Sequence, residues 1–335
     1  MVKIKTQACI QWIKDYYKDN PDGKAIIGIS GGKDSTIAAA LCVEALGADR
    51  VVGVMMPQGQ QTDIDDSTEV CDLLGIIPLT INIGLTCFTL TDWIAGSLTA
   101  EPHNKKYINS VKEVTNNSMI TTNLPARIRM TTLYAVAALY PNSRVVNTCN
   151  RSEDYVGYST KFGDAAGDFS PLGNLTVREI LEIGDELGLP EHLVHKAPSD
   201  GMCGKTDEDN LGFTYDELDN YILGTGEVSD ETKAKIEKLH KATRHKYTPM
   251  PTYDLEEIIY KELVQLDIDD INVVTSADGG LVTPGRTMAN LCADISAAAA
   301  NNANFNVDYK LEDAIKSIEN SLWKSVMCNE IRGNK

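Results

Sequence analysis

The sequence contains no apolar run that approaches the length of a membrane span, which needs about 20 consecutive apolar residues. Its first segment, MVKIKTQACIQWIKDYYKDN, also lacks the continuous apolar core of a secretory signal peptide. The apolar residues of that segment recur at helical spacing instead. We therefore expect a cytoplasmic protein that has no membrane partner.

The cysteines form no CxxC pair and no Cys/His cluster at the spacing of metal ligands. This absence gives no support to a zinc or iron–sulfur site, and it is typical of proteins in a reducing compartment. Cys42 and Cys71 lie in apolar helical patterns, where a thiol behaves as a small buried hydrophobic group. These two cysteines therefore indicate packing and not chemistry.

Basic residues are in deficit: 31 Lys and Arg stand against 48 Asp and Glu, and the formal net charge is −17. A nucleic-acid surface needs a basic face that neutralises phosphates, so we expect no nucleic-acid partner. The simplest role of this acidity is solubility. Any anionic ligand must be held by a few locally placed Lys, Arg or backbone N–H groups.

What the sequence does contain is a regular alternation of apolar strands and helical segments. Strands are expected over residues 25–30, 51–56, 78–83 and 143–149. Helices are expected over 4–19, 34–47, 63–75 and 123–140, with short helices and a mobile loop in 85–120. Because each strand is nearly continuous in Val and Ile, the pattern predicts an α/β fold with a doubly wound, mainly parallel sheet and flanking helices.

The pattern changes beyond residue 150. A stretch rich in Gly, Ser and Asp follows, and loops of that length are usually functional. Further helices are expected over 175–188, 214–223 and 229–244, before a linker near residue 250. We divide the chain into a domain over 1–253 and an α+β C-terminal extension over 254–335, whose role the sequence does not identify.

The segment GISGGKDST (28–36) joins the first strand to an alanine-rich helix. Its glycines let the N–H groups of Gly31, Gly32 and Lys33 turn toward an anion. The start of the following helix adds its dipole, and Ser30 and Ser35 add hydroxyls. The segment therefore predicts a phosphate-binding loop. It differs from the common P-loop because Lys33 is followed by a carboxylate.

That carboxylate, Asp34, would repel a bare phosphate and so implies a divalent cation between them, such as Mg²⁺. The alternative is a helix cap without further function. Glu153 follows the fourth strand by a few residues, at the edge where open α/β sheets bind ligands. It is placed to share the Mg²⁺ with Asp34, although a solvated loop carboxylate is the alternative.

The SGGxDS pattern resembles the pyrophosphate loop of the ATP pyrophosphatase superfamily, whose members cleave ATP between the α- and β-phosphates. Over roughly residues 5–252 the chain also resembles ammonia-dependent NAD synthetase, which has an adenine nucleotide alpha hydrolase-like fold. The segments that carry this resemblance are NLPARIRMTTLY, TCNRSEDYVGYSTKFGDAAGDFSPL, KAPSDGM, DEDNLGFTYDELDNYI and RHKYTPMP.

The resemblance assigns roles to individual residues. It implies ATP contacts from Gly28, Ser30, Gly31, Gly32, Lys33, Asp34, Ser35, Thr148 and Ser199. It implies contacts with the dinucleotide substrate, deamido-NAD, from Arg127, Lys161, Asp168, His245 and Lys246. It makes Asp34 and Glu153 the Mg²⁺ ligands and places Asp34, Lys161 and Asp168 at the chemistry. Either Asp34 or Asp168 accepts the proton that ammonium loses, and the sequence does not decide which.

Some positions depart from the family pattern. A lysine that contacts an ATP phosphate in the family is replaced by Val177. Either the adjacent Arg178 takes over that contact or the contact is lost. Near the second strand, Met55 or Met56 and Gln58 stand where the family often has a basic residue and a tyrosine.

The implied reaction is amidation of deamido-NAD to NAD through an acyl-adenylate, with AMP and pyrophosphate as products and a homodimer as the active form. No amide-hydrolysing module precedes the phosphate loop, so ammonia is the expected nitrogen donor unless a separate protein supplies it. Two alternatives stay open. A tRNA-modifying ATP pyrophosphatase is opposed by the negative charge and the absence of paired cysteines. A non-catalytic adenine-nucleotide sensor is opposed by Asp34, Glu153 and Lys161.

Overall fold

A computed structural model describes residues 2–59, 64–101, 110–196 and 206–252 of the chain. The chain divides into two units, and the first of them covers residues 1–249. The helices and strands predicted over 254–335 lie outside the described residues, so the predicted extension stays a prediction. Everything below concerns the first unit.

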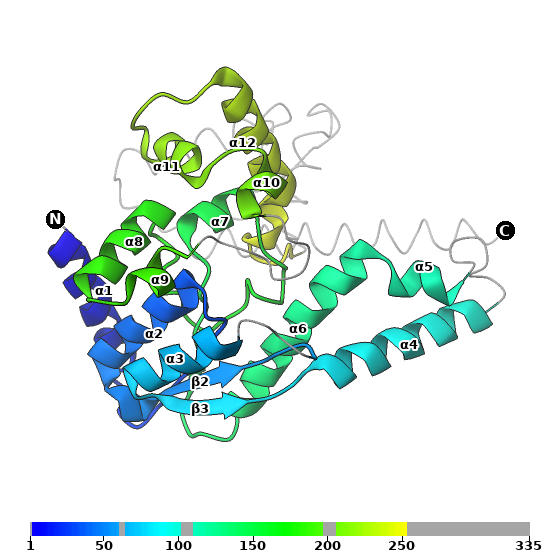
Figure 1. The fold of residues 1–335 in the computed structure, drawn as a ribbon, viewed down its shortest axis with the longest axis horizontal. Coiled ribbons are helices and arrows are strands. Elements are labelled where there is room, and N and C mark those ends of the chain that lie inside the picture. Colours follow the sequence, from blue (N-terminus) through cyan, green and yellow to red (C-terminus); the bar gives the residue numbers. More distant parts are fainter. Residues whose placement is uncertain (1, 60–63, 102–109, 197–205, 253–335) are drawn as a thin grey trace, which may run out of the picture. The chain divides into compact units, whose positions relative to one another are not determined.

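Four parallel strands form the sheet, in the order β3-β2-β1-β4. The strands are β1 (Ala25–Gly28), β2 (Val51–Met55), β3 (Ile77–Thr80) and β4 (Arg144–Val145). In the register of the sheet, Ile26 of β1 lies between Val52 of β2 and Val145 of β4. This arrangement confirms the predicted parallel sheet and its α/β class (Figure 1).

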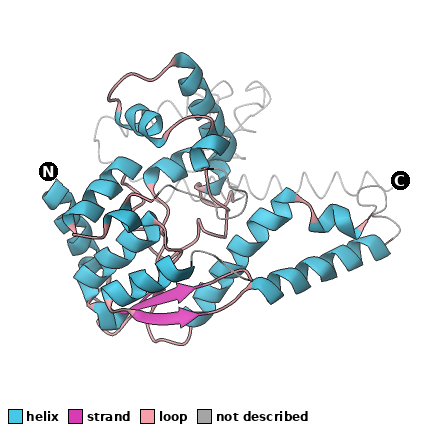
Figure 2. Ribbon diagram, viewed as in Figure 1, coloured by secondary structure: helices cyan, strands magenta, loops and turns pink. Residues whose placement is uncertain are grey.

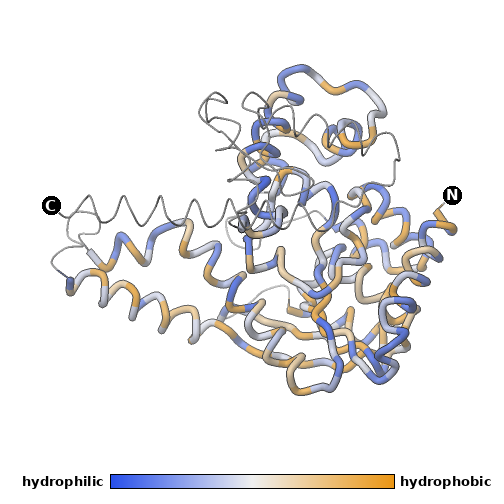
Figure 3. The backbone as a smooth tube through the Cα atoms, turned by 180° about the vertical axis from the view of Figure 1, so that it is seen from behind, coloured by the Kyte–Doolittle hydropathy of each residue, from blue (hydrophilic) through white to orange (hydrophobic). Residues whose placement is uncertain are grey.

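Helices cover both faces of the sheet because both faces of its strands are apolar. Ile26, Val52 and Val54 pack with residues of α6 (Ser118–Ala137) in one core cluster. Their neighbours along the strands, Ile27 and Met55, pack on the opposite side with residues of α1 (Val2–Tyr16), α2 (Lys33–Leu46), α3 (Ile64–Leu74), α8 (Val177–Glu186) and α9 (Glu191–Val194). Alternation along a strand therefore distributes its side chains between two buried layers. Figure 2 draws the strands in magenta among the cyan helices, and Figure 3 colours the backbone by hydropathy.

The helices have the following bounds. They are α1 (Val2–Tyr16), α2 (Lys33–Leu46), α3 (Ile64–Leu74), α4 (Gly84–Ala100), α5 (Val111–Thr115), α6 (Ser118–Ala137), α7 (Arg151–Val156), α8 (Val177–Glu186), α9 (Glu191–Val194), α10 (Asp207–Leu211), α11 (Tyr215–Leu223) and α12 (Asp230–Thr243), with 3₁₀ turns at Ala48–Arg50 and Arg244–Lys246. In the part of the chain that the structure describes, no helix is both long and apolar enough to cross a bilayer.

Some regions differ from the prediction. Within 85–120, where short helices and a mobile loop were predicted, residues 84–100 form one continuous helix, α4, while α5 is a short helix as predicted, and residues 102–109 lie outside the described residues. Helix α6 begins at Ser118 instead of residue 123 because Asn117 caps its first turn. The strand predicted over 143–149 is shorter, at Arg144–Val145. The predicted long loop after residue 150 contains a short helix, α7. The three helices α4, α5 and α6 extend together away from the sheet (Figure 1).

Candidate active site

The loop between β1 and α2 has a backbone that only glycine accommodates readily. Gly31 has φ +76°, a conformation that side-chain-bearing residues rarely adopt. A Cβ added there would lie 2.9 Å from Cβ of Asp66 and 3.0 Å from the backbone N of Ser67, both on α3. Helix α3 thus packs directly under the loop, and the glycine is required twice, for its φ and for the close approach.

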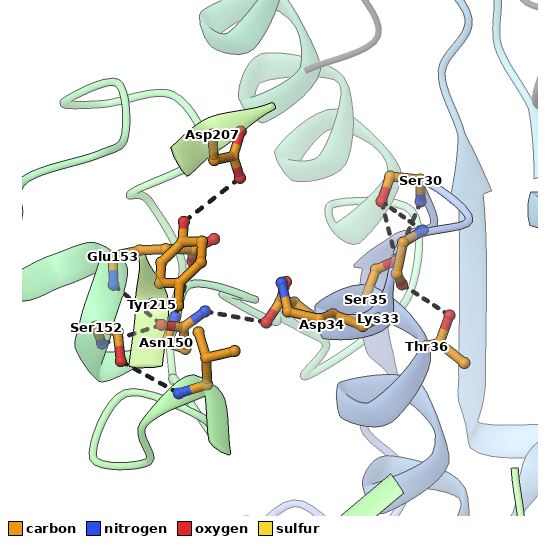
Figure 4. Close-up of polar contacts among 12 residues, drawn as sticks. Ser30, Lys33, Asp34, Ser35, Thr36, Asn150, Ser152, Glu153, Asp207 and Tyr215 are labelled. Carbon is orange, nitrogen blue, oxygen red and sulfur yellow. Dashed lines mark hydrogen bonds and ion pairs between the residues drawn. The ribbon is translucent and has the colours of Figure 1, made fainter. Parts of the chain in front are cut away.

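Hydroxyl groups hold the loop in shape without a ligand. Oγ of Ser30 lies 3.1 Å from Oγ of Ser35, and the backbone N–H of Gly32 donates to Oγ of Ser30 at 3.2 Å. Ser35 and Thr36 donate their hydroxyls to the carbonyl of Gly32 at 3.1 and 2.8 Å. Figure 4 shows these contacts at the start of α2. The cradle predicted from the sequence is therefore pre-organised.

Asp34 lies at the first turn of α2 and is held from two sides. Its Oδ2 accepts from Nζ of Lys33 at 2.8 Å, and its Oδ1 accepts from Nδ2 of Asn150 at 3.0 Å. Asn150 is fully buried and comes directly after the β4 region. Its amide therefore connects the loop after β1 with the loop after β4, across the carboxyl edge of the sheet.

Glu153 is brought to the same place by the N-terminal cap of α7. Asn150 accepts the backbone N–H of Glu153, and Oε2 of Glu153 accepts the backbone N–H of Asn150 at 3.1 Å, which is a capping box. Burial and the negative charge of Asp34 raise the pKa of Glu153 well above its ordinary value, although Lys33 and the Asn150 N–H oppose this. The two predicted metal ligands are therefore electrostatic neighbours.

The carboxylates of Asp34 and Glu153 suit a cation whose other ligands are phosphate oxygens and water. Among the described residues, no group of three or more His, Cys, Asp or Glu side chains is arranged to hold a metal ion. Two neighbouring carboxylates beside a phosphate loop suit Mg²⁺, because Mg²⁺ is commonly held by one or two carboxylates plus phosphate oxygens and water.

Lys33 and Tyr215 belong to the same cluster of titratable side chains. The side chain of Lys33 is only 6% exposed, and its ammonium lies 5.7 Å from the centroid of the Tyr215 ring. The hydroxyl of Tyr215 donates to Oδ2 of Asp207 at 3.4 Å. Burial alone would lower the pKa of Lys33, but the charges of Asp34 and Glu153 raise it. Lys33 therefore stays cationic and neutralises part of the acidic cluster.

A buried hydrogen-bond network fixes α7, α8 and α11 relative to one another. The hydroxyl of Ser152 donates to Oδ1 of Asp219 at 2.5 Å and accepts from the backbone N–H of Val177 at 3.1 Å. Oδ2 of Asp219 accepts from the backbone N–H of Arg178 at 2.8 Å. This network sets the position of α7 and hence of the Glu153 carboxylate.

A second group of site residues connects the turn after α7 with the end of α12. Nζ of Lys161 donates to the carbonyl of His245 at 2.5 Å. In return, Nζ of Lys246 donates to the carbonyls of Gly157 and Ser159 at 2.7 and 2.6 Å. The structure therefore brings together three of the predicted substrate residues, which lie far apart in the sequence.

Asp164 lies in this second group, although sequence reasoning assigned it no role. One carboxylate oxygen accepts the backbone N–H of Thr160 at 2.9 Å. Its backbone carbonyl accepts from Nδ2 of Asn147 at 2.8 Å, which ties it to the end of β4. The charge of Asp164 acts on Arg129 and on Lys246. The sequence feature that could have identified Asp164 is its position in the GDAAGD segment.

Asp168 is held differently. Its Oδ2 accepts the backbone N–H of Val145 at 2.7 Å, and its Oδ1 accepts the hydroxyl of Tyr134 at 3.2 Å. Val145 pairs with Ile26 in the middle of β1, the strand that leads into the phosphate loop at Gly28. The carboxylate of Asp168 thus continues the hydrogen bonding of β4 at the level of the sheet.

The remaining predicted residues have these positions. Arg127 is exposed on α6, and its Nε donates to the carbonyl of Lys161 at 3.3 Å. The guanidinium of Arg178 pairs with Asp216 and donates to Asn220 on α11, so the structure does not bring it to the phosphate loop. Thr148 is half-buried just after β4. Ser199 lies outside the described residues.

Comparison with known proteins adds to this geometry. A family model described as NAD synthase matches residues 5–250. The NH(3)-dependent NAD(+) synthetase of Alkaliphilus metalliredigens is 34% identical over 259 residues, which cover 75% of this chain and 98% of the relative. The enzyme of the same name from Methanococcoides burtonii is 40% identical over 217 residues, which cover 63% of this chain and 76% of the relative.

A solved structure shows the same similarity in three dimensions. The NMN synthetase from Francisella tularensis superposes with a TM-score of 0.65 at 33% identity, covering 76% of this chain and 99% of that chain. The family match spans the phosphate loop, Glu153 and the Lys161–His245 contact described above. The chain belongs to the NAD synthase family.

Proposed function

We propose that this protein catalyses the ATP-dependent amidation of deamido-NAD by ammonia, giving NAD, AMP and pyrophosphate. The observation that carries this proposal is the joining of the SGGKDS loop to Glu153 through Asn150, in a chain that matches the NAD synthase family. The relatives named above are ammonia-dependent NAD synthetases. Family membership favours this activity over a nucleotide sensor or a tRNA-modifying enzyme.

In the first step the nicotinate carboxylate attacks the α-phosphorus of ATP. The N–H groups of Gly31, Gly32 and Lys33 and the hydroxyls of Ser30 and Ser35 bind the departing pyrophosphate. Asp34 and Glu153 would hold Mg²⁺, which when bound neutralises charge on the phosphates. The hydroxyl of Ser35, which donates to the carbonyl of Gly32 in this structure, would turn to the phosphate oxygens when ATP binds.

In the second step ammonia attacks the acyl carbon and AMP leaves. Ammonium must first lose a proton, and a carboxylate close to the acyl group serves as acceptor. Asp164 is a candidate for this role beside Asp168, because its charge acts on Arg129 and Lys246. Each of the two carboxylates accepts one backbone N–H, that of Asp164 from Thr160 and that of Asp168 from Val145.

The substrate has a second candidate, the mononucleotide that carries the same nicotinate group. The superposed protein from Francisella tularensis is an NMN synthetase, and the chemistry at the carboxylate is the same for both substrates. Initial rates with deamido-NAD and with nicotinate mononucleotide, measured at equal concentrations, distinguish the two. A higher kcat/KM with the mononucleotide would replace the first candidate by the second.

The exposed apolar face of α4 supports a homodimer. This helix contains one charged side chain, Asp92, and large apolar side chains on it face solvent. They are Leu85, Phe88 and Trp93, and Met119 at the start of α6 is similarly exposed. An exposed apolar patch of this kind marks an interaction site, and a second copy of the chain is the partner we propose.

The free thiols of Cys42 and Cys71 support a cytoplasmic location, since both are buried and unpaired with another cysteine.

The central test of the proposed function is a product analysis. Purified protein with ATP, Mg²⁺, deamido-NAD and ammonium should release NAD, AMP and pyrophosphate in equal amounts. Release of ADP and phosphate would contradict the proposal. Replacing ammonium by glutamine should abolish the reaction unless a separate protein supplies ammonia.

A further inference from the structure

Arg129 is a half-buried arginine at the carboxyl edge of the sheet, and no role has been given to it above. It lies on α6, and its Nε donates to the carbonyl of Met56, directly after β2, at 3.2 Å. A Cβ on Gly28 would contact Met56 and Leu133, which is one turn further along α6. Arg129 therefore lies close to the point where β1 enters the phosphate loop.

The positive charge of Arg129 has no matching ion pair among the residues that the structure describes. Its one hydrogen bond uses Nε. Burial lowers the pKa of Arg129, which is the direction expected for a desolvated cation. Burying a charge without an ion-pair partner costs free energy. This arrangement therefore indicates that the guanidinium binds an anion.

The other cations of this edge are engaged or exposed. Lys161 and Lys246 donate to backbone carbonyls of each other's segments. Arg127 is exposed and bonds the carbonyl of Lys161 through Nε. Lys33 is paired with Asp34. Arg129 is thus the half-buried cation of this group whose terminal nitrogens are available to a ligand.

The part of α6 that carries Arg129 packs against the turn after α7. A Cβ on Gly163 of that turn would lie 2.9 Å from Cβ of Ala126, and Nε of Arg127 donates to the carbonyl of Lys161 at 3.3 Å. The charges of Cys87 and of Asp164, in the same turn, also act on Arg129. These contacts place this part of α6 beside the turn that carries the predicted substrate residue Lys161, where the proposed function expects the acyl group.

On the basis of the proposed function, we propose that Arg129 binds the carboxylate that becomes amidated and so makes the site selective for the acid over the amide. A guanidinium matches a carboxylate with two parallel N–H donors. The amide product is neutral and offers one acceptor oxygen. Its contact with Arg129 is therefore weaker, which favours release of the product.

The test compares deamido-NAD with NAD, which differ in that carboxylate alone. Binding of each to the nucleotide-free protein is measured by calorimetry for the wild type, Arg129→Gln and Arg129→Lys. The wild type should bind deamido-NAD more tightly than NAD. Arg129→Gln should lose about ten- to hundred-fold in affinity for deamido-NAD, with its affinity for NAD nearly unchanged. Arg129→Lys keeps the positive charge but lacks the two parallel N–H donors of the guanidinium, so it should lose less affinity for deamido-NAD than Arg129→Gln.

Arg144→Gln is a matched control, because Arg144 is also half-buried and donates to a backbone carbonyl, at the start of β4. An equal loss of affinity for deamido-NAD and NAD in Arg129→Gln would overturn the inference, since it would indicate a structural role. Loss of ATP affinity alone would also overturn it and assign Arg129 to the phosphates. Failure of the wild type to bind deamido-NAD would instead overturn the proposed function. If Arg129→Gln does not fold, Arg129→Lys and thermal shifts with both ligands give the same comparison.

Discussion

The ammonium of Lys33 lies 2.8 Å from Oδ2 of Asp34, and the charges of both groups act on Glu153. In the absence of a metal ion, Lys33 therefore acts as the counter-ion of two carboxylates that would otherwise repel each other. We expect Lys33→Met to destabilise the metal-free protein by about 3 kcal/mol, which is typical when one partner of a buried ion pair is removed. Urea unfolding without Mg²⁺ measures this loss.

Mg²⁺ should restore part of the lost stability. The metal replaces the missing positive charge, so Mg²⁺ without ATP should raise the unfolding midpoint of Lys33→Met more than that of the wild type. Lys14→Met, on the exposed face of α1, is the control. An identical response of wild type and variant to Mg²⁺ would mean that Lys33 does not occupy the place of the cation.

Gly31→Ala should weaken ATP binding through the backbone of the loop. The added Cβ strains a φ of +76° and meets α3 at 2.9 Å, so the N–H groups of the cradle shift. We expect an increase of more than about ten-fold in the Kd for ATP, since the loop donors are geometry-dependent. Gly188→Ala is a matched control, with φ +70° but nothing within 4 Å of the new Cβ. That variant should lose about 1 kcal/mol of stability and bind ATP as the wild type does.

Several features of this site were predictable from sequence and others were not. The loop, Asp34 and Glu153 follow from local patterns beside apolar strands, because strand ends determine which residues meet at the sheet edge. The contact between Asn150 and Asp34 joins positions 116 residues apart, and only the packed fold brings them together. Helix α7 has six residues, so its apolar residues do not repeat often enough to reveal a helical pattern in the sequence. Its capping box stabilises the helix.

The extended helix α4 was missed for a related reason. Its apolar residues do not form a single stripe, because part of the helix faces the core at Cys87 and Ala95 while Phe88 and Trp93 face solvent. Because α4 has apolar residues on its core side and on its solvent side, its sequence shows no clear helical periodicity. The roles expected for Arg178 and Asp168 rested on family motifs, whereas their side chains engage α11 and β4.

Glu179 makes the stability of the protein sensitive to acid. It caps α8 by accepting the backbone N–H of Thr176 at 2.9 Å and pairs with Lys5 of α1 at 2.7 Å. Burial alone would raise the pKa of Glu179, but these contacts hold it below its ordinary value. Its stabilising contribution is therefore complete above the pKa of an unfolded Glu and is lost as the pH falls through the lower pKa of the folded state.

Glu179→Gln should cost about 1–2 kcal/mol at pH 7, from the cap and the partly exposed ion pair together. The difference from the wild type should shrink as the pH falls below about 4, where the wild-type carboxylate also becomes protonated. Denaturant unfolding over this pH range measures it, with Glu186→Gln on the exposed end of α8 as control. A difference that does not change with pH would exclude the ionised carboxylate as its source.

Substitutions on the face of α4 should change the oligomeric state. Phe88 and Trp93 are 71% and 69% exposed in the single chain, so replacing both by serine should leave the fold intact while removing apolar contact area. We expect the wild type to elute as a dimer and the double variant as a monomer in light-scattering chromatography. Leu139→Ser, an exposed apolar position beyond the end of α6, is the control. A double variant that stays dimeric would place the interface elsewhere.

The proton acceptor can be assigned by comparing Asp164→Asn with Asp168→Asn. The charge of Asp164 acts on Arg129 and Lys246, so its amide variant should lower kcat by about a hundred-fold or more. Because its carboxylate accepts the N–H of Thr160 at 2.9 Å, this variant should also lose about 1–2 kcal/mol of stability. Asp168 accepts the N–H of Val145 at 2.7 Å. Its variant should lose about 1–2 kcal/mol of stability, because an amide replaces a charged acceptor. A larger loss of kcat in Asp168→Asn than in Asp164→Asn would return the catalytic role to Asp168.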